Sequence, residues 1–291
     1  MKISVVGPGA MGCLFAARLA LAGFKTVLVD YNAERARRLA KSGLTIDGDP
    51  ETHTGSPRVT VEIPPRQDLV ILLVKAYSTR AVRLPPGVPV LTLQNGLGNA
   101  ETLCEMAGNS HVLAGTTSEA CTYISEGHVR HVAPGTTTIG SWTSCPAEPV
   151  VEALGKAGFR VRLTSSPGSA IWEKAAASAG INPLTALLDV TNGRLVEIPE
   201  ARQLLRDLVV EAAKVAATEG YRFDFSLVEQ AEEICRATAA NVSSMLQDRR
   251  AGRKTEIEAI SGEIIRRAEL ASLPVPRTRV VWQLLKSIEE R

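Results

Sequence analysis

Aromatic residues and unbalanced charge are both scarce in this chain of 291 residues. Phe, Trp and Tyr make up 4% of it, which argues against a surface that stacks nucleic-acid bases. The 33 Lys and Arg nearly balance the 31 Asp and Glu, so the formal net charge is only +2. Because so small a charge gives no strong field to attract nucleic acid or an anionic membrane, we expect small molecules as partners.

Patterns typical of metal sites, disulfide frameworks and membrane segments are also lacking. The five cysteines form no CxxC pair and no Cys/His cluster; they are Cys13, Cys104, Cys121, Cys145 and Cys235. An odd number of unpatterned thiols is typical of a reducing cytoplasm. The N-terminus reaches a glycine turn too early for a signal peptide, and no apolar run reaches the ~18 residues of a membrane helix. We therefore expect a cytoplasmic protein without a bound metal.

Short apolar runs alternate with helical patterns through the first half of the chain. Strands are expected at residues 3–6, 26–29, 69–74 and 88–93, and helices at 10–22, 33–42 and 98–106. This alternation predicts βαβ units and a parallel sheet covered on both faces. Residues 112–140 alternate Thr, Ser, Val and Gly with turns, which predicts antiparallel strands added to one edge of that sheet. A helix near 146–157 and a strand at 160–163 complete the domain.

The second half of the chain shows only helical periods. They are expected at residues 170–188, 199–219, 226–239, 255–271 and 277–290. At ~100 to 200 residues per domain, the length favours two domains. We predict an α/β Rossmann-type domain over residues 1–166 and an all-α substrate domain over 167–291, with the active site in the cleft between them.

A glycine-rich turn joins the first predicted strand to the first predicted helix. It has the pattern G-x-G-x-x-G and consists of Gly7, Pro8, Gly9, Ala10, Met11 and Gly12. In a dinucleotide site the first glycine allows the tight turn, the second lets the backbone approach the pyrophosphate, and the third lets helix and strand pack closely. The position of the motif favours dinucleotide binding over a purely structural turn.

Asp30 ends the second predicted strand, where an acidic side chain usually binds the adenosine ribose hydroxyls. Its carboxylate would repel a 2′-phosphate, which favours NADH. Two alternatives remain open at this stage. Asp30 faces solvent or caps the next helix, or the nearby Arg35, Arg37 and Arg38 supply a partner for the 2′-phosphate of NADPH.

Two groups of polar residues mark the second domain. Lys174, Ser178 and Asn182 follow one another at steps of four, so they share one slowly rotating stripe of a helix. This stripe either binds a partner or is a solvated face with a snorkelling lysine. The second group runs from Asn241 to Glu256, and by itself it is equally consistent with a loop that leads to a helix capped by Thr255.

Several motifs in order along nearly the whole chain resemble the ketopantoate reductase (2-dehydropantoate 2-reductase) family. They are GPGAMG at 7–12, LLVKAY at 72–77, LQNG at 93–96, GTTSEA at 115–120, GTTTIG at 135–140, WEKAAASAGINPLTALLDVTNG at 172–193 and NVSSMLQDRRAGRKTEIEAISG at 241–262. The last two are far more specific than the glycine turn. The resemblance implies an NADPH-dependent reductase of 2-dehydropantoate, with a helical domain like the C-terminal domain of 6-phosphogluconate dehydrogenase.

The resemblance also implies roles for individual residues. Lys174 is the implied proton donor to the ketone, and Glu256 holds or tunes it. Asn95 lies near the nicotinamide ribose and the substrate, while Lys75 and Ala120 belong to the cofactor site. The implied substrate-binding residues are Asn95, Ser178, Asn182, Asn192, Asn241 and Ser244.

Two positions depart from the family pattern. Ser178 stands where the family commonly has Asn, which shortens or removes one hydrogen bond to the substrate. Asp30 stands near a position where the family often has Arg. Reduction of another 2-oxo acid, NADH as the cofactor, and a non-catalytic dinucleotide sensor are therefore the alternatives, and the chain is expected to be a monomer or a homodimer.

Overall fold

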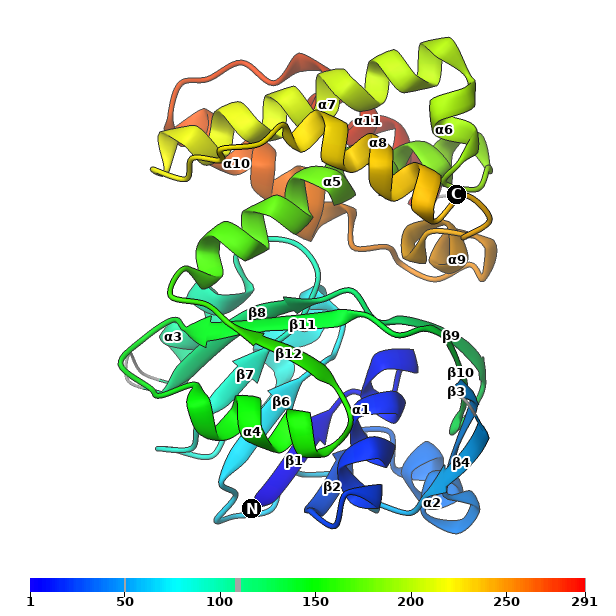
Figure 1. Cartoon of the computed structure of the whole chain (residues 1–291), viewed down its shortest axis with the longest axis vertical. Helices are drawn as coiled ribbons and strands as arrows, with labels where there is room; N and C mark the ends of the chain where they lie inside the picture. Colours follow the sequence, from blue (N-terminus) through cyan, green and yellow to red (C-terminus); the bar gives the residue numbers. More distant parts are fainter. Residues whose placement is uncertain (50, 108–110, 291) are drawn as a thin grey trace. The chain divides into compact units, whose positions relative to one another are not determined.

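The computed structural model describes residues 1–49, 51–107 and 111–290. The chain forms two compact units (Figure 1). The first comprises residues 1–94 and 99–168, and the second comprises residues 95–98 and 169–291. The short segment 95–98 therefore leaves the first unit and packs with the helical one, which the sequence analysis did not anticipate.

The first unit is built on a sheet with the strand order β12-β11-β8-β7-β6-β1-β2-β5. The strands are β1 (Lys2–Val6), β2 (Lys25–Val29), β5 (Arg58–Thr60), β6 (Leu69–Leu72), β7 (Val90–Thr92), β8 (Val112–Thr117), β11 (Thr136–Ser141) and β12 (Arg160–Leu163). From β5 to β8 every pairing is parallel. β11 runs antiparallel to β8, and β12 is parallel to β11. The apolar strands β1 and β6 are buried, as expected for a sheet covered on both faces.

A second sheet corrects the expectation for residues 112–140. Its order is β4-β3-β10-β9, with β3 (Leu44–Asp49), β4 (Glu51–Gly55), β9 (Ala120–Ser125) and β10 (His128–Ala133). The prediction of antiparallel strands at the edge of the main sheet holds for β8 and β11, which pair antiparallel there although β8 is parallel to β7, and it is wrong for β9 and β10. β10 instead pairs in parallel with β3, where Val129 lies opposite Ile46 and both side chains are buried.

Helices cover the sheets of the first unit. They are α1 (Ala10–Leu21), α2 (Ala33–Ser42), α3 (Asn99–Ala107) and α4 (Glu148–Lys156), with the 3₁₀ turn η1 (Ala76–Ala81) after β6. α1 contacts strands of both sheets (Figure 1). Because it is enclosed in this way, its Ala, Leu and Phe side chains are buried almost all round the helix.

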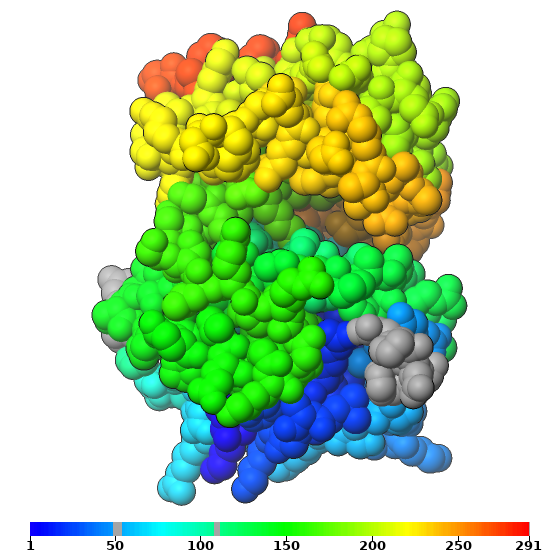
Figure 2. Space-filling model, viewed as in Figure 1, coloured from blue at the N-terminus to red at the C-terminus, as the bar shows by residue number. Residues whose placement is uncertain are grey.

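The second unit is helical throughout its described part. Its helices are α5 (Pro167–Leu188), α6 (Arg194–Glu197), α7 (Pro199–Thr218), α8 (Leu227–Ala237), α9 (Ser244–Arg250), α10 (Glu263–Leu270) and α11 (Pro276–Glu289), and a π-turn, η2 (Glu258–Gly262), precedes α10. α7 and α8 form much of this unit's surface on the side drawn in Figure 2. The predicted helix at 255–271 is thus interrupted by a π-turn, and α9 falls in the segment that the sequence left open as a loop. Among the described residues, no helix is long and apolar enough to cross a membrane.

Candidate active site

The glycine turn has the geometry that its sequence predicts. Gly7 has a φ of +107°, and a Cβ there would lie 2.7 Å from the Val74 backbone nitrogen. A Cβ on Gly12 would lie 1.7 Å from the Gly7 carbonyl oxygen, so only glycine lets α1 pack this closely on the turn. Gly9 is the N-cap of α1, and its Cβ position is open, with no atom within 4 Å. The backbone at the start of α1 is therefore accessible to a phosphate group.

The other residues predicted to bind the cofactor lie mostly after neighbouring parallel strands. Gly7 follows β1, Asp30 follows β2, and Lys75 comes three residues after the end of β6. Since β2, β1 and β6 are adjacent and parallel, these positions share one edge of the sheet. Ala10 and Met11 occupy the first turn of α1, and Ala120 is the first residue of β9 in the second sheet.

The Asp30 carboxylate is buried and engaged within its own unit. Its Oδ2 accepts a hydrogen bond from Arg35 Nε at 2.5 Å, and its Oδ1 accepts from Arg35 Nη2 at 2.8 Å and from the Asn32 backbone N–H at 3.0 Å. This bond with Asp30 raises the pKa of Arg35. Asn32 caps α2 by accepting from the Arg35 backbone N–H. Asp30 therefore neither faces solvent nor caps the helix itself; it forms a bidentate ion pair with the first-turn arginine.

In the helical unit, Lys174 on α5 donates a hydrogen bond from Nζ to Asn95 Oδ1 at 2.8 Å. Burial lowers the pKa of Lys174 to about 8, while the negative charge of Glu256 opposes this shift. Glu256 is itself buried. Three residues that are far apart in the sequence are thus brought together around one amine, which is poised to release a proton near neutral pH.

The remaining predicted substrate residues fall into two places. Ser178 and Asn182 are partly buried on α5, on the same helix face as Lys174. Asn192 and Asn241 are joined by a hydrogen bond from the Asn192 backbone N–H to the Asn241 carbonyl oxygen at 3.0 Å. Ser244 is exposed and is the first residue of α9.

Asn192 has one satisfied and one unsatisfied side-chain group. Its Nδ2 donates to Thr238 Oγ1 at 2.8 Å. Its Oδ1 is buried and has no hydrogen-bond partner among the residues that the structure describes. A buried amide oxygen without a partner costs stability, so it is a candidate acceptor for a donor group of a ligand.

Comparison with known proteins identifies the family. The profile described as "Ketopantoate reductase PanE/ApbA" matches residues 3–144, and the one described as "Ketopantoate reductase PanE/ApbA C terminal" matches residues 168–289. The chain is 36% identical to the 2-dehydropantoate 2-reductase of Halobacterium salinarum over 98% of each chain. This chain belongs to the ketopantoate reductase family. The resemblance seen in the sequence is confirmed.

Solved structures show the same fold. A PanE/ApbA family ketopantoate reductase from Ralstonia eutropha JMP134 has a TM-score of 0.91 and 27% identity, over 100% of this chain and 99% of that one. A D-mandelate dehydrogenase with NADH and anilino(oxo)acetate has a TM-score of 0.92 at 24% identity, over 100% of this chain and 99% of that one. The predicted combination of a Rossmann-type domain and a helical domain is confirmed, and the family consists of dinucleotide-dependent reductases.

Two polar residues of this ketopantoate reductase family member were not among the predicted site residues: Thr185, and Ser243, which lies in the polar group from Asn241 to Glu256. Thr185 Oγ1 lies 2.6 Å from Ser243 Oγ, and both side chains are buried. The Ser243 hydroxyl also caps α9 by accepting from the Leu246 backbone N–H. Thr185 lies three residues after Asn182, a spacing that keeps it on the same helix face, whereas a further step of four reaches Ala186. This pair fixes the start of α9, where Ser244 lies.

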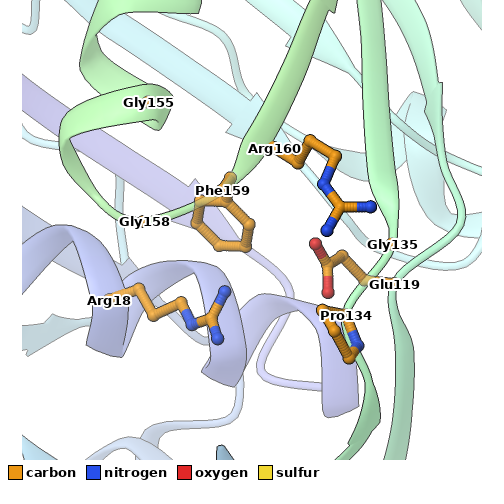
Figure 3. Close-up of a pocket in the computed structure, with 8 residues that line it drawn as sticks. All are labelled: Arg18, Glu119, Pro134, Gly135, Gly155, Gly158, Phe159 and Arg160. Carbon is orange, nitrogen blue, oxygen red and sulfur yellow. The ribbon is translucent and has the colours of Figure 1, made fainter.

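The first unit also has a pocket of about 310 Å³. Figure 3 shows Arg18, Glu119, Phe159 and Arg160 around it. Two of its charged side chains already interact with protein groups. The Arg18 guanidinium lies 5.0 Å from the Phe159 ring centroid, and Glu119 Oε2 lies 2.5 Å from His131 Nε2. None of its lining residues is among those predicted to bind cofactor or substrate in this family.

Proposed function

We propose that this protein reduces the ketone of 2-dehydropantoate to the alcohol of (R)-pantoate, a step in pantothenate and hence coenzyme A biosynthesis. The observation that carries the proposal is the partly buried Lys174 amine in a chain of this family. Its Nζ donates to Asn95 Oδ1 at 2.8 Å, and the charge of Glu256 raises its pKa against the larger lowering by burial. A non-catalytic dinucleotide sensor has no need of such a proton donor, so we favour the enzyme.

A bound nicotinamide dinucleotide supplies the hydride that forms the new C–H bond at the ketone carbon. The start of α1 fits its pyrophosphate, since Gly9 leaves the backbone open and Gly7 makes the turn. Lys174 hydrogen-bonds the ketone oxygen, stabilises the negative charge that develops there and transfers its proton to that oxygen. The lysine is left neutral, and a pKa of about 8 makes the proton transfer easier than from an ordinary lysine.

For the substrate, we propose that Asn182, Asn192, Asn241 and Ser244 bind its hydroxyl and carboxylate groups. The unsatisfied Asn192 Oδ1 supports a hydroxyl donor there, because an amide oxygen accepts from O–H but repels a carboxylate. The exposed Ser244 hydroxyl can donate to a carboxylate. Ser178, in place of the common Asn, supports a second candidate, a reductase of a related 2-oxo acid.

For the cofactor, we propose NADPH, with NADH as the alternative. The bidentate bond from Arg35 offsets the charge of Asp30, which weakens the repulsion of a 2′-phosphate. The Arg35 side chain is 37% exposed, so its guanidinium remains within reach of a phosphate.

We also propose a cytoplasmic location and a monomer or homodimer. The cysteines are free thiols, and burial raises the pKa of both Cys13 and Cys121 to about 12, which keeps them protonated and unreactive. Light scattering of the purified chain distinguishes the two oligomeric states.

One assay tests the reaction. Purified protein is mixed with NADPH or NADH, and oxidation of the cofactor is followed with 2-dehydropantoate and with other 2-oxo acids in parallel. We expect the highest kcat/KM with 2-dehydropantoate and NADPH. A higher kcat/KM with another 2-oxo acid would support the second candidate, and no turnover of any 2-oxo acid would contradict both.

A further inference from the structure

The π-turn η2 leaves one backbone carbonyl without its usual partner in the helix. In a regular helix, the Glu263 N–H would donate to the carbonyl of Ala259, four residues earlier. Here it donates to the carbonyls of Glu258 and Ile260 and bypasses that of Ala259. Widened turns of this kind are rare and occur frequently at functional sites.

The bypassed Ala259 carbonyl is used by another part of the same unit. It accepts a hydrogen bond from the Leu97 backbone N–H at 2.8 Å. Leu97 belongs to the segment 95–98, which packs with the helical unit. The π-turn therefore creates the acceptor that holds this segment in place.

The contact at Gly96 is tight. Gly96 has a φ of +83°, and a Cβ there would lie 2.3 Å from the Ala259 carbonyl oxygen. Since no side chain fits between them, the backbone of the segment lies directly on the π-turn. The next residue toward the N-terminus is Asn95, whose Oδ1 accepts the bond from Lys174 Nζ.

The same turn also starts beside Glu256. The Ile260 N–H donates to the Glu256 carbonyl oxygen at 3.1 Å, so Glu256 lies one turn before the bypassed carbonyl. The backbone around the π-turn thus carries Glu256, whose charge acts on Lys174. It also holds the segment that contains Asn95, whose side-chain oxygen accepts the hydrogen bond from Lys174.

We propose that the π-turn at Glu258–Gly262 is a positioning device, which places Asn95 on the Lys174 amine through the Leu97 to Ala259 hydrogen bond and the Gly96 contact. Gly96 and Leu97 are then positioning residues, since they act through Asn95. The catalytic consequence rests on the proposed function, whereas the anchoring of the segment does not.

The chain offers a matched pair of variants for the test. Gly98 has a φ of +79°, close to that of Gly96, but the atoms nearest to a Cβ there belong to the Glu263 side chain, the first of them at 3.2 Å, and not to the Ala259 backbone. Gly96→Ala and Gly98→Ala therefore impose a similar backbone strain, and only Gly96→Ala disturbs the contact with Ala259.

A double-mutant cycle with Asn95→Ala separates positioning from general damage. We expect Gly96→Ala to lower kcat roughly tenfold to a hundredfold, because small misplacements of catalytic groups have effects of that size. In the Asn95→Ala background, it should lower kcat less than about twofold, because the group that it misplaces is already gone. Equal losses in both backgrounds, or a loss in Gly98→Ala as large as in Gly96→Ala, would overturn the proposal.

Amide hydrogen exchange tests the anchor without any enzyme assay. The Leu97 amide of the wild-type protein should exchange slowly, since it is bonded to Ala259, and exchange as fast as in an exposed loop would refute the anchor. This measurement decides the matter if Gly96→Ala does not fold. If the wild-type protein reduces no 2-oxo acid, the proposed function fails while a protected Leu97 amide still supports the anchor.

Discussion

Lys174 Nζ and Asn95 Oδ1 lie 2.8 Å apart, although 79 residues separate them in the sequence. The lysine comes from the long helix α5, and the asparagine comes from a loop segment that follows strand β7. Both belong to the helical unit. The proton donor that we propose is therefore held by a loop that leaves the sheet of one unit to join the fold of the other.

Removal of the amine tests the role of Lys174 directly. Lys174→Ala should lower kcat roughly 10²-fold or more, because both the proton and the positive charge on the ketone oxygen are lost. Dinucleotide affinity, measured by fluorescence titration or calorimetry, should change little. Lys156→Ala is the control, since Lys156 is an exposed lysine paired with Glu152 on α4. Near-normal turnover by Lys174→Ala would contradict the assignment of Lys174 as the proton donor.

The pH dependence of kcat follows from the lowered pKa of Lys174. Reduction needs the protonated amine, so kcat should fall as the pH rises through about 8. The charge of Glu256 raises the pKa of Lys174, and Glu256→Gln should therefore move this falling limb to lower pH. A pH series of both proteins at saturating substrate gives the comparison. A limb near the ordinary lysine value of ~10.4 would contradict the lowered pKa of Lys174.

The local pattern of the sequence predicted individual elements well. The helix at 33–42 and the strand at 160–163 occur as α2 and β12 with those bounds. Both predictions depend on neighbouring residues alone, since Asn32 caps α2 and the strand is a short run between turns. The partner of a strand is a different matter. β9 and β10 are strands as expected, but β10 pairs with β3 and with β9 in a second sheet and not with the main sheet, because pairing depends on distant buried residues such as Ile46 and Val129.

The candidate site was predicted from motifs, and its assembly was not. In the sequence, Lys174, Asn95 and Glu256 lie in separate motifs, and only the resemblance to the family assigned them to the same reaction. The π-turn had no signal in the sequence, because a residue pattern that forms an α-helix also forms a single wide turn. What stabilises the wide turn is its partner, the Leu97 N–H on a distant segment.

Cofactor preference should depend on the ion pair between Asp30 and Arg35. Asp30→Ala removes the carboxylate and frees the Arg35 guanidinium, so the ratio of kcat/KM for NADPH to that for NADH should rise by about tenfold, which corresponds to ~1.4 kcal/mol. Arg35→Ala is the matched variant and should lower the same ratio. An unchanged ratio in Asp30→Ala would mean that the ribose binds away from this ion pair. A wild-type enzyme strongly selective for NADH would overturn the proposal of NADPH.

Replacing each of the two adjacent serines at the start of α9 by alanine should affect a different property, stability for Ser243 and substrate binding for Ser244. Ser243 is buried, caps α9 and bonds Thr185, so Ser243→Ala should lower the free energy of unfolding by ~1 kcal/mol or more, as measured by denaturant titration. Ser244 is exposed, so Ser244→Ala should leave stability nearly unchanged. It should instead raise the KM for the oxo acid with little change in cofactor affinity, because a bond to the substrate is lost.

Asn241→Ala provides the second half of this test. Its backbone carbonyl bonds the Asn192 N–H and is retained in the variant, so the pairing of the two segments should persist. We expect its KM for the oxo acid to rise as in Ser244→Ala, with the affinity for the dinucleotide preserved. If either variant lowers the affinity for the oxo acid and for the dinucleotide equally, the replaced residue does not act on the substrate specifically. A normal KM in both variants would instead place substrate binding on the stripe of α5 that carries Ser178 and Asn182.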